Sequence, residues 1–111
     1  MHIITSDKSY IILPPSVQII LNRFNYSGSD FIAYSNLPNQ TKCKVFSCAE
    51  KIAKKMISIG AKGIFGIDFL VTEKEVIFLE CNFRYQGSSF ILNKGLIDAG
   101  YPSIFQMRYN A

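Results

Sequence analysis

The sequence predicts an α+β fold in which an antiparallel sheet carries helices packed on one face. Three observations lead to this prediction: short apolar segments rich in strand-forming residues, segments whose apolar residues recur with helical spacing, and two apolar runs joined by a polar turn. The chain has 111 residues, 49% hydrophobic and 18% charged, which is enough to bury one core. We therefore expect residues 1–111 to form a single domain.

Two strands are predicted near the N-terminus. Ile11–Leu13 and Val17–Phe24 are rich in β-branched and other large apolar residues, which favour extended backbone. Pro14 and Pro15 stand between them and predict a turn or an edge irregularity, because proline cannot donate a hydrogen bond to a neighbouring strand. The sheet is expected to begin here.

The following segment predicts a turn, a strand and a loop. Tyr26–Asp30 contains Gly, Ser and Asp, which are typical of turns. Phe31–Tyr34 is mainly apolar and aromatic and predicts a third short strand. Asn36–Lys42 is polar and predicts a loop.

A helix is predicted from Ser47 to Ile59. Ser47 and Glu50 have the spacing of a capping box, in which the two side chains satisfy free backbone N–H groups at the start of a helix. Gly60 is expected to end it. The apolar residues that share one face are Ala49, Ile52, Ala53, Met56 and Ile57.

A hairpin and two helices complete the prediction. The hairpin strands are Gly63–Val71 and Val76–Cys81, joined by the polar turn Thr72–Glu75 and followed by a loop. Ser88–Ala99 predicts a helix with a serine cap, and Ser103–Tyr109 predicts a last short helix after a proline.

Composition limits the class of protein. The net charge of +4 is dispersed, so a nucleic-acid-binding tail is not indicated. Cys43, Cys48 and Cys81 are odd in number, which favours a reducing compartment, and His2 is the only histidine, which disfavours a zinc site. No apolar run approaches the roughly 20 residues that span a bilayer, and no cleavable signal peptide is visible. We expect a cytoplasmic protein that binds neither nucleic acid nor membrane.

Two acidic residues interrupt the apolar hairpin strands. If the turn is centred near Lys74, Asp68 and Glu80 lie opposite each other, with Cβ atoms about 4.5–5.5 Å apart. Asn82 follows on the same face of the strand. Two carboxylates and an amide oxygen suit magnesium or manganese. The alternative from spacing alone is that Asp68 pairs with a lysine and Glu80 with Arg84 at the rim of the sheet.

The hairpin also resembles a known signature. Gly66–Leu70, followed by Phe78–Arg84 and Gln86–Ser88, is similar to the Gly-x-Asp and Glu-x-Asn-x-Arg motifs of ATP-grasp enzymes. The upstream segments Ile12–Phe24 and Tyr26–Phe31 also resemble stretches of bacterial ATP-grasp ligases. The chain is therefore identified as similar to the C-terminal half of an ATP-grasp domain of the carboxylate–amine ligase or biotin carboxylase type.

The resemblance implies roles for individual residues. Asp68, Glu80 and Asn82 would hold the Mg²⁺ or Mn²⁺ that bridges ATP phosphates, and Arg84 would stabilise the phosphate or acyl phosphate. Phe83 and Cys81 replace residues that are commoner in the family, but both are expected to point away from the ligand face. Cys81 is interpreted as a small core residue.

The segment after Arg84 is interpreted in two ways. Gln86 and Ser88 precede a helix start, where free backbone N–H groups could hold part of ATP. The alternative is an ordinary capped loop without a ligand.

The resemblance finally implies an ATP- and magnesium-dependent carboxylate ligase that works through an acyl phosphate. The lid, lysines and hinge of a complete module are not recognisable, so the chain alone is expected to be inactive. The alternative is a non-catalytic half-module that binds a partner or forms a homodimer. That association would use an open apolar face containing Ile64, Leu70 and Phe78.

Overall fold

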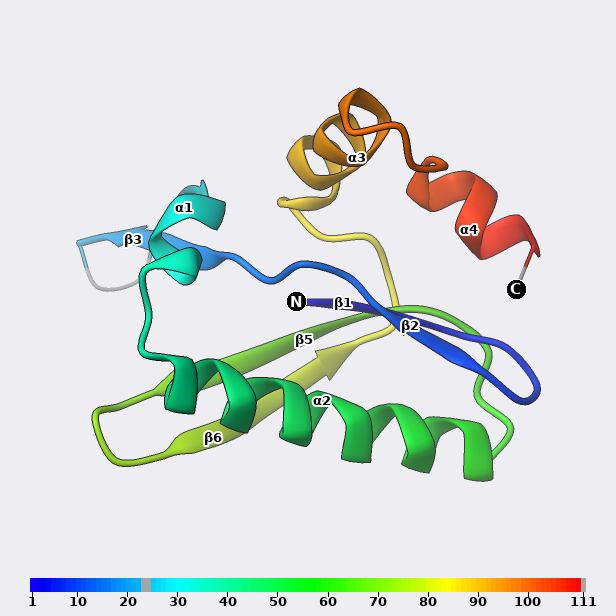
Figure 1. Ribbon diagram of the computed structural model, residues 1–111, viewed down its shortest axis with the longest axis horizontal. Coiled ribbons are helices and arrows are strands. Elements are labelled where there is room, and N and C mark those ends of the chain that lie inside the picture. The colour runs from blue at the N-terminus through cyan, green and yellow to red at the C-terminus, as the bar shows by residue number, and fades with distance from the viewer. Residues whose placement is uncertain (23–24, 111) are drawn as a thin grey trace.

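The computed structural model describes residues 1–22 and 25–110, and within them it shows two sheets and four helices (Figure 1). The main sheet is antiparallel with the order β2-β1-β5-β6. Its strands are β1 (His2–Thr5), β2 (Tyr10–Ile12), β5 (Gly63–Val71) and β6 (Val76–Asn82). The predicted α+β class with an antiparallel sheet is confirmed.

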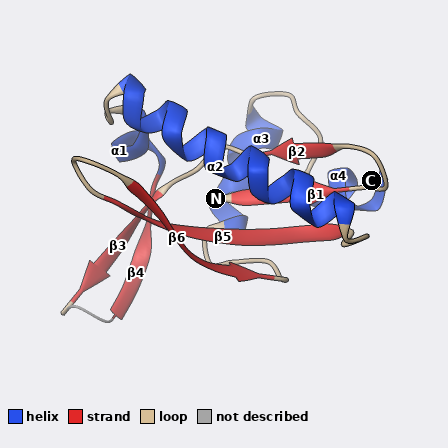
Figure 2. Cartoon of the chain, turned by 90° about the horizontal axis from the view of Figure 1, so that it is seen from below, coloured by secondary structure: helices blue, strands red, loops and turns tan. Residues whose placement is uncertain are grey.

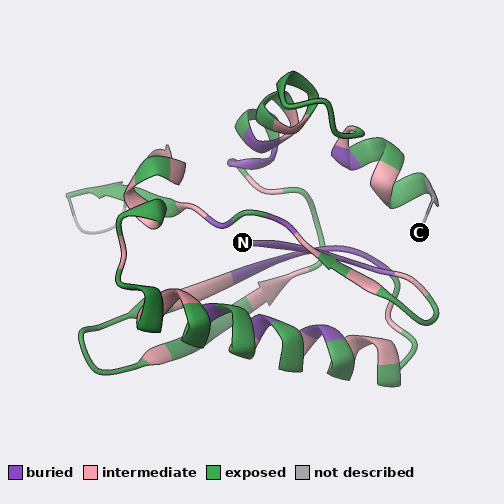
Figure 3. Cartoon of the chain, viewed as in Figure 1, coloured by how far each residue is buried: buried purple, intermediate pink, exposed green. Residues whose placement is uncertain are grey.

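Strand β1, which the sequence analysis did not predict, is an inner strand of this sheet. It pairs with β2 on one side and with β5 on the other, and all four of its residues are buried (Figure 3). Burial on both faces explains why His2–Thr5 shows no alternation of polar and apolar residues.

Helices cover both faces of the sheet, not one face as predicted (Figures 1 and 2). Alternate residues of a strand point to opposite faces, so Ile3 and Ile4 of β1 enter different cores. The core beneath α2 contains Met1, Ile3, Val45, Ala49, Ala53, Phe65 and Ile67. The core beneath α3 and α4 contains Ile4, Leu13, Ile64, Leu92 and Ile104.

Helix α2 spans Asn39–Ser58 and is longer than predicted. The predicted loop Asn36–Lys42 is wrong from residue 39 onward, and the supposed capping box at Ser47 lies in the middle of the helix. Pro38 precedes the first turn, and Val45 adds a buried position one turn before Ala49. The end was predicted correctly: Gly60 follows the helix with φ of 77°.

The segment before α2 differs most from the prediction. Residues predicted as a turn form strand β4 (Asn25–Asp30), which pairs with β3 (Val17–Leu21) in a two-stranded ribbon that projects from the main sheet (Figure 2). The predicted strand Phe31–Tyr34 is part of helix α1 (Phe31–Ser35). Asp30 caps this helix by accepting a hydrogen bond from the backbone N–H of Ala33 at 2.9 Å, and this local cap overrides strand propensity. The end of the predicted strand Val17–Phe24, at residues 23 and 24, lies outside the described residues.

The two C-terminal helices were predicted within about one residue: α3 spans Ser89–Asp98 and α4 spans Ile104–Asn110. Ser103 and Gln106 cap α4 reciprocally. The Ser103 hydroxyl accepts the Gln106 N–H at 3.1 Å, and the Gln106 side chain accepts the Ser103 N–H at 2.9 Å. No helix in the described ranges is long and apolar enough to cross a membrane.

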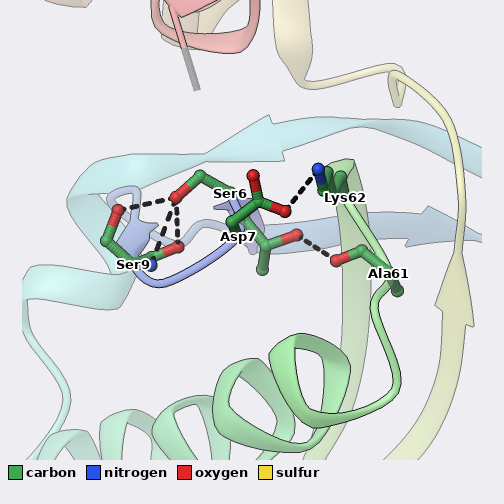
Figure 4. Close-up of polar contacts among 6 residues, drawn as sticks. Ser6, Asp7, Ser9, Ala61 and Lys62 are labelled. Carbon is green, nitrogen blue, oxygen red and sulfur yellow. Dashed lines mark hydrogen bonds and ion pairs between the residues drawn. The ribbon is translucent and has the colours of Figure 1, made fainter.

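The turn between β1 and β2 is tied to the start of β5 (Figure 4). The Thr5 hydroxyl donates to the carbonyl oxygen of Ala61 at 2.8 Å, and Lys62 forms an ion pair with Asp7. Ser6 and Ser9 close the turn through a backbone hydrogen bond of 2.9 Å and their hydroxyl groups. These contacts fix the register of β1 against β5 at the end away from Asp68.

Candidate functional site

A cleft of about 890 Å³ lies between the β3–β4 ribbon and the ends of β5 and β6. The ribbon contributes Gln18, Ile20, Tyr26 and Ser29, while the loop after β6 lines another part of the wall. Every residue that the sequence analysis assigned to the site lines this one cleft: Asp68, Glu80, Asn82, Arg84, Gln86 and Ser88.

Asp68 and Glu80 are directly opposite each other on β5 and β6, as predicted. Strand β1 pairs with β5 as far as Gly66, and Met1 exchanges backbone hydrogen bonds with Ile67, so Asp68 lies just beyond the last paired residue on that side within the described chain. Asp68 is therefore half-buried and Glu80 is exposed, whereas the sequence suggested two acids in a buried sheet. The cleft, rather than the core, receives both carboxylates.

A β-bulge next to Asp68 changes the side chains that share this face. Beyond Asp68 the register shifts, and Phe69 lies opposite Phe78. Phe78 was predicted to share the ligand face with Leu70, and this is wrong: Leu70 is opposite Ile77, and Leu79 lines the cleft. A one-residue bulge cannot be read from the alternation of apolar residues.

The carboxyl group of Asp68 is in an environment that disfavours its charge. Burial is the largest cause that raises its pKa above the usual value, and the hydrogen bond and negative charge of Glu80 raise it further. The chain's amino group and Arg84 act in the opposite direction. Gln18 donates a hydrogen bond from Nε2 to Asp68 Oδ1 at 3.3 Å. A cation between the two carboxylates would relieve their repulsion.

The donor atoms fit a hard divalent cation. Asn82 donates a hydrogen bond from Nδ2 to Glu80 Oε1 at 3.3 Å, so its amide oxygen is not used in that contact. Among the described residues no group of three or more His, Cys, Asp and Glu side chains lies close enough to hold a metal. A cation here would rest on two carboxylates, an amide and oxygen atoms of a ligand or water, which suits Mg²⁺.

Arg84 is exposed at the cleft and donates from Nη1 to the Tyr85 carbonyl oxygen at 3.2 Å. The ion pairs within residues 1–22 and 25–110 are Lys62–Asp7 and Lys94–Asp98. The alternative in which Glu80 pairs with Arg84 and Asp68 pairs with a lysine is therefore not observed there.

The residues that alternate with Glu80, Asn82 and Arg84 face away from the cleft, as predicted. Cys81 packs against the core beneath α2, and burial raises the pKa of its thiol. Phe83 lies edge-on to Phe65, with ring centroids 4.9 Å apart. Neither residue takes part in the cleft.

The segment Gln86–Ser89 leads into α3. Ser88 or Ser89 was predicted to cap this helix; Ser88 is buried at the N-cap position, but its side chain makes no capping hydrogen bond. The Ser89 hydroxyl accepts the backbone N–H of Gln86 at 2.7 Å. The Gln86 Nε2 atom is buried without a hydrogen-bond partner among the described residues.

Three residues around the site were missed by the sequence analysis. Gln18 is a polar residue within an apolar strand, which was the available signal. Gly66 was noted only as part of a motif. His2 was considered only as a zinc ligand, although a histidine in a fully buried strand requires a partner.

Comparison with known proteins decides the family: the ATP-grasp domain model matches residues 1–88. The chain belongs to the ATP-grasp family. It is 40% identical over 58 residues to the formate-dependent phosphoribosylglycinamide formyltransferase of Wolinella succinogenes, covering 51% of this chain and 15% of that protein. It is 32% identical over 96 residues to the carbamoyl phosphate synthase arginine-specific large chain of Geobacillus stearothermophilus, covering 82% of this chain and 9% of that protein.

The chain thus spans less than a sixth of the length of these ATP-grasp relatives. No solved structure matches it. The family resemblance inferred from the hairpin is confirmed, and the matched region contains all six predicted site residues.

Proposed function

We propose that this chain supplies the metal- and phosphate-binding part of an ATP- and magnesium-dependent carboxylate ligase. The observation that carries the proposal is the convergence of Asp68, Glu80, Asn82 and Arg84 on one cleft in an ATP-grasp domain. Residues 1–111 would then be a single partial module, without the lid and hinge that enclose the nucleotide.

Each residue has a separate task in this proposal. Asp68, Glu80 and Asn82 would hold Mg²⁺ or Mn²⁺, which when bound neutralises charge on the phosphates of ATP. Arg84 is exposed at the cleft, where its guanidinium group would stabilise the negative charge of a phosphoryl group. Gln86 and Ser88 line the wall beside Arg84, where the side-chain amide of Gln86 and the backbone N–H of Ser88 would bind phosphate oxygens.

The names of the two relatives support the class of substrate. Formate, named in the first, is a carboxylate, and carbamoyl phosphate, named in the second, is a mixed anhydride of a carboxylic-type acid and phosphate. Both are consistent with a carboxylate that becomes an acyl phosphate. We extend only this shared chemistry to the present chain.

Calorimetric titration with Mn²⁺ tests the metal site. The wild-type chain should bind Mn²⁺ weakly, and the double substitution Glu80→Ala, Asn82→Ala should abolish binding because two of the three ligands are removed. Glu73→Ala is the matched control, since it removes one negative charge from the exposed hairpin turn outside the cleft. Superimposable curves for the wild type and the double variant would refute the metal site.

The second candidate is a non-catalytic half-module that associates with a partner or with itself. It is favoured by exposed apolar side chains at the open end of the sheet: Leu70 is 49% exposed on the face that carries Asp68, and Phe78 is 47% exposed on the opposite face. Ile64, which was also predicted on the open face, is only 8% exposed because α3 and α4 cover it. The open area is therefore smaller than the sequence suggested.

A further inference from the structure

A buried chain of hydrogen bonds joins β1 to the loop that leads into α3. His2 Nε2 and Ser89 Oγ are 2.7 Å apart, and the same Ser89 oxygen accepts the backbone N–H of Gln86 at 2.7 Å. His2 is 1% exposed and Ser89 is 7% exposed. Short hydrogen bonds between buried groups hold their members in one arrangement.

The Ser89 hydroxyl connects the two groups. Its oxygen accepts the Gln86 N–H, and it also shares one hydrogen bond with His2 Nε2, in which either atom can be the donor according to the tautomer of the imidazole. Both bonds therefore converge on the Ser89 Oγ atom.

The same loop is held at a second point, above Gly66. His2, Gly66 and Asn82 lie in one row across β1, β5 and β6, so they share a face of the sheet. A Cβ atom on Gly66 would lie 1.4 Å from Nε2 of Gln86. The Gln86 side chain therefore occupies the space that the glycine leaves between His2 and Asn82.

The backbone N–H of Gln86 is bonded to Ser89, whereas its side-chain Nε2 atom has no hydrogen-bond partner among the described residues, and the residue lines the cleft. A buried donor without a partner is costly unless water or a ligand supplies an acceptor. Arg84 lines the same cleft, and its positive charge favours a ligand whose acceptor is an anionic oxygen, in a phosphate or a carboxylate.

We propose that His2 and Ser89 are positioning residues that hold Gln86 across Gly66, so that its amide binds an anionic oxygen of the ligand beside Arg84. This inference rests on the proposed function, because the anion is the phosphate or carboxylate of the ligase reaction. Ser89 contacts both His2 and Gln86, so His2 acts on Gln86 through Ser89, and both act on the ligand only through Gln86.

The test compares four variants of the full chain. Ser89→Ala removes the shared hydroxyl, His2→Leu removes its hydrogen-bond partner, and His2→Gln keeps a side chain in that place that can donate or accept a hydrogen bond. Ser58→Ala is the matched control, because it removes an exposed serine hydroxyl that donates to the Lys55 carbonyl oxygen within α2. Far-UV circular dichroism verifies folding. Should His2→Leu not fold, Ser89→Ala decides the question by itself, since it removes a single oxygen atom.

Two readouts are expected to change together. Amide hydrogen exchange of Gln86, followed by NMR, should accelerate about tenfold in Ser89→Ala and in His2→Leu. Affinity for pyrophosphate in saturating Mn²⁺ should fall about two- to tenfold, the range for one lost hydrogen bond. Affinity for Mn²⁺ alone should stay at the wild-type value, and His2→Gln should restore much of both effects. Titration with formate in place of pyrophosphate shows whether the anion is a phosphate or a carboxylate.

The outcomes separate this inference from the proposed function. Gln86 exchange and anion affinity in Ser89→Ala equal to those in Ser58→Ala would overturn the positioning role. A wild-type chain that binds neither Mn²⁺ nor either anion would overturn the ligand role of Gln86 together with the proposed function. Mn²⁺ binding without any anion binding would overturn the ligand role of Gln86 alone.

Discussion

His2 gives the fold a dependence on pH that can be predicted with its sign. Burial lowers the pKa of this imidazole from 6.5 to about 4, and the positive charge of the chain's amino group adds to the effect. In the unfolded chain the same group titrates near its ordinary value. The unfolded state therefore binds a proton below about pH 6.5, where the folded state does not, and stability falls as the pH decreases from about 6.5 to about 4.

The magnitude follows from the difference between the two pKa values. The difference of about 2.5 between the pKa of His2 in the unfolded and in the folded state corresponds to at most about 3.4 kcal/mol of unfolding free energy. Between pH 7 and pH 4.5 the expected loss from His2 is about 2 kcal/mol. Asp68 acts in the opposite direction, because its pKa is raised in the folded state and protonation there favours folding as the pH falls.

The assay compares wild type with His2→Gln, which cannot titrate in this range. Urea unfolding at pH 7, 5.5 and 4.5 gives the free energy of unfolding of each protein, and the contribution of Asp68 cancels in the difference. The wild type should lose about 2 kcal/mol more than His2→Gln between pH 7 and 4.5. Parallel losses in the two proteins would show that His2 is not buried as a neutral group.

Three further predictions concern the cleft and its open end. Gly66→Ala should displace the Gln86 side chain and weaken pyrophosphate binding in saturating Mn²⁺ about two- to tenfold. Because the displaced atoms all belong to the side chain of Gln86, the free energy of unfolding should change by about 1 kcal/mol or less. Calorimetry measures the pyrophosphate affinity, and urea unfolding measures the free energy of unfolding. Purified chain should release no ADP from ATP, and sustained metal-dependent release that is lost in Arg84→Ala would contradict this. Light scattering should report a mass above the 12.5 kDa monomer, whereas a monomer at tens of micromolar would argue against association through Leu70 and Phe78.

The hairpin could be predicted because its signals are local. The four-residue polar turn pairs Val71 with Val76, a register that by itself would place Asp68 opposite Leu79. The bulge adds one residue and brings Glu80 opposite Asp68. The predicted pairing of the two acids is therefore correct, whereas the pairing of Phe78 and of the residues between it and the turn is shifted by one residue. The identities of the acids and of Asn82 and Arg84 then carried the family resemblance.

Other parts of the fold depend on information that local patterns do not contain. β1 is a four-residue inner strand in which a histidine and a threonine are buried, so neither alternation nor composition marks it. Helix α1 depends on one capping bond from Asp30 in a segment whose residues favour strands. The first turns of α2 are polar because they lie mainly in solvent, and only Val45 reaches the core there. Tertiary contact determines the secondary structure in each case.

Gly66 links the two halves of the site in a way that neither motif shows by itself. It lies two residues before Asp68, so both residues face the same side of the sheet, where a larger side chain at position 66 would fill the space beside the carboxylate. The missing side chain instead admits Gln86 from a loop that begins after Asn82. The loop can then run back over the sheet to Ser89 and His2, with Arg84 at the cleft before these attachments. The glycine of the first motif therefore shapes the second, because it lets the loop that carries Gln86 lie close to the strand that carries Asp68.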